Sequence, residues 1–121
     1  MNAVTADLRL ALAETGLRPA LFALLTIVHS NPGIIQTAAG NALGIQRANL
    51  VPLLNDLEQR KLIERRAAPH DRRACALHLT SEGAVLFDEA MRRIREHEAR
   101  FFGRLTEGER MAFSRILAKL A

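Results

Sequence analysis

Basic side chains are concentrated in the middle third of the chain, where they suit binding to a polyanion. Residues 44–73 carry seven basic side chains against four acidic ones, whereas residues 1–43 carry two of each. The seven are Arg47, Arg60, Lys61, Arg65, Arg66, Arg72 and Arg73. A formal net charge of +4 is common among globular proteins, so the position of the charge is more informative than its size. We therefore expect an acidic partner to bind this segment.

Several side chains in and near this segment match the contacts by which proteins bind DNA. The helix expected after Gly44 would present free N–H groups and the positive end of its dipole, and Arg47 would add a charge suited to phosphate. Asn49 can pair with an adenine edge in the major groove, or it can be an ordinary solvated amide. Gln36 and Thr37, which open the preceding helix, are expected to hold the phosphate backbone and set the register.

A second group of polar residues lies in a segment that predicts a β-hairpin. Residues 74–79 alternate apolar with small or polar side chains, which is the period of a half-buried strand. A short run over residues 62–66 supplies a partner strand, and a loop containing Pro69 joins the two. The tip would display His70, Arg72 and Arg73. Guanidinium groups at such a tip can enter a narrow minor groove, where negative potential is concentrated, unless the tip is merely solvated.

Helical patterns occupy the rest of the chain and supply the scaffold. Apolar residues at spacings of three and four predict helices over about 5–14, 19–30, 35–43, 47–60 and 80–102, and a final helix after a capping box at Thr106 and Glu109. The helix over 19–30 is so densely apolar that it must be buried on nearly all sides. The helices over 35–43 and 47–60, joined by a turn at Gly44, predict a helix-turn-helix. The last two helices either complete a monomeric core or form a dimer interface, and we favour the interface.

Catalysis and metal binding are not indicated. The sequence has no phosphate-cradling glycine loop, no carboxylate pair set in an apolar stretch and no serine or cysteine beside a plausible base, so we do not expect an enzyme. The four histidines fall in four different expected elements without paired ligand spacing, so we expect no metal or other cofactor. Cys75 lies on the apolar face of its strand, which predicts a buried structural thiol rather than a redox sensor.

Length and composition fit one globular domain. The chain has 121 residues, of which 49% are hydrophobic and 25% charged. No run approaches the roughly 18 uninterrupted apolar residues that span a bilayer, and the N-terminus lacks the pattern of a signal peptide. A single cysteine cannot form an internal disulfide, which fits a reducing compartment. We therefore expect a cytoplasmic protein that does not enter a membrane.

A helix-turn-helix, a basic hairpin and a long helix in this order resemble the winged helix of the MarR family of bacterial transcriptional regulators. The resemblance covers about residues 17–120, and its most specific part is the run from Asp71-Arg72-Arg73 to Leu79-Thr80 and Gly83. It implies one domain that is mainly α with a small β-hairpin wing. Residues 17–80 would form the DNA-binding lobe, and residues 1–16 and 81–121 would supply N- and C-terminal dimerisation helices.

The resemblance also implies partners and residue roles. It implies a homodimeric repressor that binds double-stranded DNA at a pseudo-palindromic operator and is released by a small anionic or phenolic effector. The recognition helix would be about residues 46–60 and the wing 67–73, with Arg73 in the minor groove and Asp71 bracing the wing. The residues expected to contact DNA are Gln36, Thr37, Gln46, Arg47, Asn49, His70, Arg72 and Arg73. The effector pocket would be lined by Phe22, Leu25, His29 and Phe87, unless these residues simply pack in the core.

Two residues depart from the family pattern. Pro52 cannot donate a hydrogen bond to the carbonyl of Ala48, so the start of the recognition helix should bend or loosen, and Gln46 replaces the usual serine or threonine cap. We therefore expect binding to depend more on phosphate and shape contacts than on base contacts. The alternative function is a winged-helix module that docks other proteins without specific DNA binding.

Overall fold

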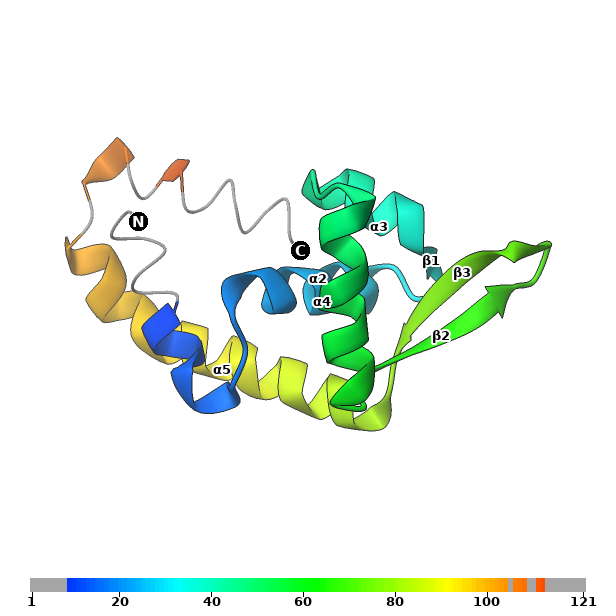
Figure 1. The fold of residues 1–121 in the computed structure, drawn as a ribbon. Helices are drawn as coiled ribbons and strands as arrows, with labels where there is room; N and C mark the ends of the chain where they lie inside the picture. The colour runs from blue at the N-terminus through cyan, green and yellow to red at the C-terminus, as the bar shows by residue number, and fades with distance from the viewer. Residues whose placement is uncertain (1–8, 105, 109–110, 113–121) are drawn as a thin grey trace.

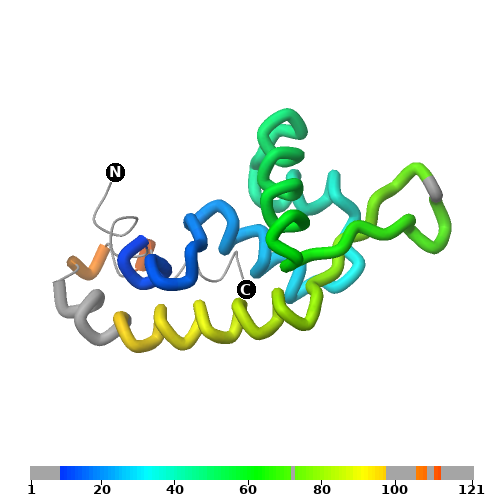
Figure 2. Tube along the Cα trace, turned by 60° about the horizontal axis from the view of Figure 1, so that its bottom comes forward, coloured from blue at the N-terminus to red at the C-terminus, as the bar shows by residue number. Residues whose placement is uncertain are grey.

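The fold is a helical lobe with a small sheet at one end and a long helix along its base (Figure 1). The computed structural model describes residues 9–104, 106–108 and 111–112. Residues 9–12 are helical, and the elements that follow are η1 (Ala13–Thr15), α2 (Pro19–Ser30), β1 (Ile34–Ile35), α3 (Gln36–Leu43), α4 (Arg47–Gln59), β2 (Ile63–Ala68), β3 (Asp71–Leu79) and α5 (Ser81–Arg104). The predicted class, mainly α with a β-hairpin, is confirmed. Figure 2 shows the hairpin of β2 and β3 projecting beyond the body of the lobe.

Helix α2 lies in the core because its sequence is apolar on nearly every side. Pro19 occupies its first position, where the missing N–H is not needed, and the residues from Leu21 to Val28 are buried apart from Ala23. The hydroxyl of buried Thr26 donates to the Phe22 carbonyl at 2.9 Å, so this polar group is satisfied within the helix. The predicted burial of this helix on nearly all sides is confirmed.

The sheet has three antiparallel strands in the order β1, β3, β2, one strand more than the sequence predicted. Ile34 and Ile35 pair with Leu77 and Ala76 of β3. The helix predicted over about 35–43 is confirmed, and α3 begins one residue later, at Gln36, because Ile35 pairs in the sheet. Ala76 is only 2% exposed and lies between Ile35 of β1 and Arg66 of β2 in the register of the sheet.

Thr80 and Gly83 fix the start of α5 to the segment between α4 and β2. The Thr80 hydroxyl accepts the Gly83 N–H at 2.9 Å and donates to the Lys61 carbonyl at 2.6 Å. The Thr80 N–H donates to the Leu62 carbonyl at 3.1 Å. A Cβ atom on Gly83 would lie 2.0 Å from the same carbonyl oxygen, so only glycine fits there. The predicted N-cap at Thr80 is confirmed.

Helix α4 ends in a Schellman motif whose left-handed residue is a lysine. The N–H of Lys61 donates to the Glu58 carbonyl, and the N–H of Leu62 donates to the Leu57 carbonyl, both at 2.9 Å. Lys61 has φ of 62°, a region that costs an L residue free energy and that glycine adopts freely. This conformation could not be predicted from the residue type, because lysine is a good helix former.

Parts of the expected structure lie outside the described residues. These parts are the start of the helix over 5–14, Glu109 of the capping box, and the apolar residues of the final helix at Phe113, Ile116, Leu117 and Leu120. Among the described helices, no single one is long and apolar enough to cross a membrane, although the segments 9–15 and 19–30 meet that test as a bent pair. Most apolar residues of that pair belong to the core.

Candidate nucleic-acid interface

Helix α4 exposes the side chains of its first three residues. Its N-cap is Gln46, whose side chain makes no capping hydrogen bond, but the N–H groups of Asn49 and Leu50 both donate to the Gln46 carbonyl at 2.9 Å. Arg47, Ala48 and Asn49 are exposed. Neither Arg47 nor Asn49 has a side-chain partner among the described residues. A cation and a free amide therefore stand side by side on an accessible helix end.

Pro52 does not interrupt the helix. Helix α4 runs continuously from Arg47 to Gln59, and its first turn is hydrogen-bonded, so the loosening expected from the sequence is not seen. The Ala48 carbonyl has lost its helical donor, but Ala48 and Pro52 are both exposed, and water can satisfy such a carbonyl. The cost of the proline is low because it lies on the solvent side of the helix.

Helices α3 and α4 approach closely at Gly40, which confirms the predicted helix-turn-helix. A Cβ atom on Gly40 would lie 2.9 Å from Leu50 Cδ2 and 3.1 Å from the Ile45 carbonyl oxygen. Gly44, with φ of 67°, forms the turn between the helices. This packing presents the first turn of α3, which no side chain caps, on the same surface as the start of α4.

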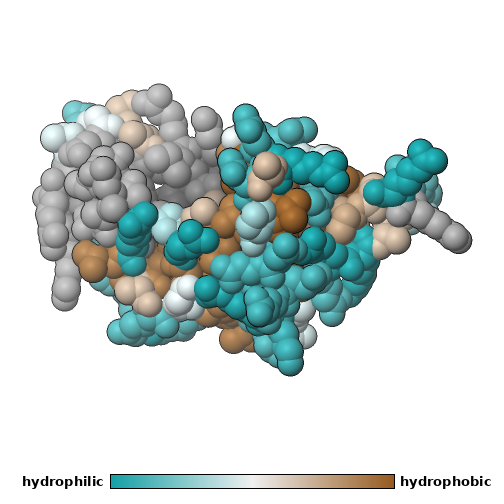
Figure 3. Space-filling model, viewed as in Figure 1, coloured by the Kyte–Doolittle hydropathy of each residue, from teal (hydrophilic) through white to brown (hydrophobic). Residues whose placement is uncertain are grey.

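The hairpin places a polar turn at its far end. Its strands β2 and β3 are joined by Pro69 and His70, and His70 is exposed. Asp71 Oδ1 accepts the backbone N–H of Arg73 at 2.9 Å, a contact that fixes the first residues of β3. The predicted hairpin is confirmed, with Arg72 and Arg73 at the start of the returning strand. The face in Figure 3 is mostly hydrophilic over the helix-turn-helix and the hairpin.

A cleft of about 430 Å³ lies between the hairpin and the helix-turn-helix, and we call it the interface cleft. It is lined by Ile35, Gln36, Thr37, Arg47, Arg65, Asp71, Arg73, Ala74 and Cys75. Four of the residues expected to contact DNA meet here, from three different elements: Gln36, Thr37, Arg47 and Arg73. Gln46, Asn49 and His70 are exposed but do not line the cleft. Three arginines against one aspartate make it a cationic site.

Cys75 is less buried than the sequence predicted. The thiol packs against the core on one side, but the residue is only partly buried and lines the interface cleft. Its cross-strand neighbour on β2 is Ala67, which is too small to cover it. The predicted burial of Cys75 is therefore only partial, and its role as a structural thiol stays a prediction.

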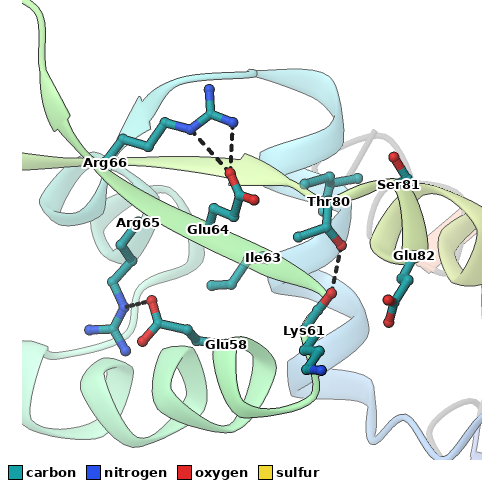
Figure 4. Close-up of a pocket in the computed structure, with 10 residues that line it drawn as sticks. Glu58, Lys61, Ile63, Glu64, Arg65, Arg66, Thr80, Ser81 and Glu82 are labelled. Atoms are coloured by element: carbon teal, nitrogen blue, oxygen red, sulfur yellow. Dashed lines mark hydrogen bonds and ion pairs between the residues drawn. The ribbon is translucent and has the colours of Figure 1, made fainter.

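Arg65 is a site residue that the sequence did not identify. Its Nη2 donates to Asn55 Oδ1, and its Nε forms an ion pair with Glu58 Oε2 at 3.3 Å without the alignment of a hydrogen bond (Figure 4). Both partners belong to α4, so Arg65 ties β2 to α4. A signal was present, because Arg65 lies two residues after buried Ile63 and so shares its strand face.

A second cleft, of about 730 Å³, lies between the end of α4, β2 and the start of α5, and we call it the outer cleft (Figure 4). It carries both signs of charge, from Glu58, Lys61, Glu64, Arg65, Arg66 and Glu82. Arg66 is already paired with Glu64, whose Oε2 lies 2.6 Å from Nη2. Because its charges are mixed and partly paired, the outer cleft suits a polyanion less well than the interface cleft.

Of the four residues expected to line an effector pocket, Phe22 and His29 stack on a third, Phe87. The ring centroid of His29 lies 4.1 Å from that of Phe87, and that of Phe22 lies 5.9 Å from it. Phe22 and Leu25 are buried, whereas His29 is exposed. None of the four lines either cleft described above. Among the described residues, no group of three or more potential metal ligands occurs.

Comparison with known sequences places these features in one family. The family model described as MarR family matches residues 15–74. A putative transcriptional regulatory protein for the hcr operon of Thauera aromatica is 31% identical over 105 residues, which are 87% of this chain and 63% of that protein. The HTH-type transcriptional repressor MdtR of Bacillus subtilis is 28% identical over 92% of this chain and 72% of its own length. The chain thus spans less than two thirds of the first of these relatives.

Solved structures agree with the sequence comparison. The transcriptional repressor CouR bound to a 23-mer DNA duplex superposes with a TM-score of 0.83 at 36% identity, over 97% of this chain and 83% of that chain. CouR bound to p-coumaroyl-CoA superposes with a TM-score of 0.79 at 33% identity, over 97% and 82% of the two chains. With a winged helix built from the expected residues and a relative this similar over most of its length, the chain belongs to the MarR family of transcriptional regulators.

Proposed function

We propose that the protein is a homodimeric repressor that binds a pseudo-palindromic operator in double-stranded DNA in the cytoplasm. Helix α4 would enter the major groove, and the hairpin of β2 and β3 would enter the flanking minor groove. The observation that carries this proposal is the interface cleft, in which Arg47 and Arg73, which have no carboxylate partner among the described residues, converge beside two accessible helix starts. Helix starts and guanidinium groups are favourable partners for phosphate.

Each exposed residue has a separate role in this proposal. Asn49 would read an adenine edge, while the apolar surfaces of Ala48 and Pro52 would contact thymine methyl groups. Gln36 and Thr37 would bind the phosphate backbone from α3. Arg47 and Gln46 would add contacts at the start of α4. Only one amide in this set reads base edges by hydrogen bonds, which supports stronger reliance on phosphate contacts.

The wing residues would act in the minor groove and on its edges. Arg73 lies on the hairpin side of the interface cleft and is exposed, so its guanidinium is available to the groove. Asp71 would keep this part of β3 rigid through its hydrogen bond to the Arg73 N–H. His70 in the turn and Arg72 after it would contact phosphates flanking the groove.

An aromatic, anionic effector would release the protein from DNA. CouR has been solved with p-coumaroyl-CoA, which is both phenolic and anionic, and this supports the same chemical class here. The stacked rings of Phe22, His29 and Phe87, with His29 accessible, offer an aromatic surface for such a ligand. Release requires that the ligand bind the DNA-free arrangement more tightly than the DNA-bound one.

Selection of preferred sequences from random DNA tests the function directly. We expect half-sites about one helical turn apart, because each protomer presents one recognition helix. A dimer making about 6 to 10 phosphate contacts should lose about 10³ to 10⁵ in affinity between 50 and 200 mM salt. The alternative function, a module that docks other proteins, predicts no such loss of DNA affinity with increasing salt. A protein that stays monomeric and ignores DNA at low ionic strength would refute the proposal.

A further inference from the structure

Arg65 carries a charge that its protein partners neutralise only in part. Its side chain is 21% exposed, and its Nε is buried without a hydrogen-bond acceptor although Glu58 Oε2 lies 3.3 Å away. The partner of its Nη2 is the amide oxygen of Asn55, which is neutral. A buried donor without an acceptor destabilises the state in which it occurs. The ion pair with Glu58 supplies a counter-charge but no aligned hydrogen bond, so Arg65 can accept a further anionic partner.

The position of Arg65 shows where that partner would lie. The side chain lines the interface cleft and the outer cleft, so it stands between the two. In the interface cleft it joins Arg47 and Arg73, opposed by the single carboxylate of Asp71, which already accepts a backbone N–H. An anion entering this cleft would meet three cations, whereas the outer cleft offers several carboxylates.

DNA geometry supplies the anion. A helix in the major groove and a hairpin in the adjacent minor groove are separated by one sugar–phosphate backbone, because that backbone forms the ridge between the grooves. The interface cleft lies between α4 and the hairpin, where this ridge must pass. The backbone carries one phosphate per about 3.4 Å along each strand, so at least one phosphate would face the cleft.

We propose that Arg65 binds a backbone phosphate of the operator in the interface cleft and gives up its contact with Glu58 to do so. This inference rests on the proposed DNA-binding function. The guanidinium has five N–H donors, so it can keep its bond to Asn55 while another edge turns to the phosphate. Asn55 thereby becomes a positioning residue, and Glu58 a competitor that holds Arg65 in the absence of DNA.

Neutralising single phosphates of the operator tests this contact. A selected operator duplex is synthesised with one uncharged methylphosphonate at each backbone position in turn, and its dissociation constant is measured by fluorescence anisotropy with the full-length protein. The variants are Arg65→Gln and the matched control Arg66→Gln. Each removes one positive charge from β2, but Arg66 does not line the interface cleft and is paired with Glu64.

The expected result is a loss of additivity at one phosphate in each half-site. At that phosphate the methylphosphonate should weaken binding of the wild-type protein by about ten- to a hundredfold. The Arg65→Gln protein should bind the methylphosphonate duplex as well as it binds the unmodified duplex, because the contact is already lost. Arg66→Gln should keep the wild-type pattern at every position. If the losses from Arg65→Gln and from the methylphosphonate added fully at every position, while wild type bound the unmodified operator, the inference would be overturned. Failure of wild type to bind any duplex would instead count against the proposed function.

Glu58→Gln tests the same exchange without altering Arg65. Removing the competing carboxylate should strengthen operator binding several-fold more than Glu64→Gln, which removes an equal charge from a carboxylate that pairs with Arg66 instead. The advantage of Glu58→Gln should vanish at the methylphosphonate position identified above. Equal gains from the two glutamate variants would show that only net charge matters, and would also overturn the inference.

Discussion

Replacing Lys61 by glycine should stabilise the protein although it removes a side chain. Lys61 has φ of 62°, and an L residue in this region costs about 1–2 kcal/mol that glycine avoids. Glycine in turn costs about 0.5–1 kcal/mol through its greater freedom in the unfolded chain. The Lys61 side chain has no partner among the described residues, and its backbone bonds to Glu58 and Thr80 are retained. The net expected gain is about 0.5–1 kcal/mol.

Urea unfolding followed by circular dichroism measures this gain. The protein concentration must be held constant, because the stability of the proposed dimer would depend on it. With an unfolding entropy of about 2.1 cal/mol/K per residue over 121 residues, the gain corresponds to an increase in Tm of about 2–4 °C. Lys61→Ala is the control, since it removes the same ammonium group but keeps a Cβ atom in the left-handed region.

The comparison between the two variants decides the matter. Lys61→Ala should unfold close to wild type, and Lys61→Gly should unfold at a higher urea concentration than both. If Lys61→Gly were no more stable than Lys61→Ala, the left-handed backbone would not be a source of strain and the reasoning would be wrong.

Three further outcomes follow from the structure. Gly83→Ala should destabilise the fold by about 3 kcal/mol or more, because its Cβ would lie 2.0 Å from the Leu62 carbonyl oxygen. The control, Gly108→Ala, has open space for a Cβ atom and should melt at the same temperature as wild type. If both variants melted at the same temperature, the close contact at Gly83 would be contradicted. Asn49→Ala should weaken binding to operators that carry the matching adenine by about 1–3 kcal/mol and leave the dependence of DNA affinity on salt unchanged. If wild type preferred its operator strongly over other DNA and Asn49→Ala lost that preference altogether, the reliance on phosphate contacts would be disproved. Hydrogen bonding and charge from Arg92 hold the pKa of Glu89 below its ordinary value of 4.5, so the stability that this carboxylate contributes is present above that value and is lost as pH falls through the lowered pKa. Urea unfolding between pH 3 and 6 should show a weaker pH dependence in Glu89→Gln, and identical curves would exclude the contribution.

Elements with a clear period were predictable from the sequence, and those without one were not. The buried helix α2, the leucine-lined helix α4 and the alternating strand β3 each repeat a pattern over six or more residues. Strand β1 has only two residues, Ile34 and Ile35, so it has no period to detect, and its pairing depends on where β3 lies. The left-handed conformation of Lys61 could not be predicted either, because it is imposed by the packing of the segments on either side and not by the residue type.

The site was predictable as a set of residues but not as an arrangement. Residue types and the family resemblance identified Gln36, Thr37, Arg47 and Arg73, and the structure brings these four to one cleft. Arg65 was missed because its importance depends on which face of β2 meets α4. The exposure of Cys75 was missed because it depends on the small size of a residue on the neighbouring strand.

The two hydrogen bonds from Thr80 to the carbonyls of Lys61 and Leu62 tie the segment between α4 and β2 to the start of α5. Helix α5 has 24 residues and is about 36 Å long, so tilting one end by about 5° displaces the other by about 3 Å. That displacement is close to the spacing of successive base pairs, about 3.4 Å. In the proposed dimer, a ligand that changed the angle between the two copies of α5 by only a few degrees would therefore carry each α4 out of step with its half-site.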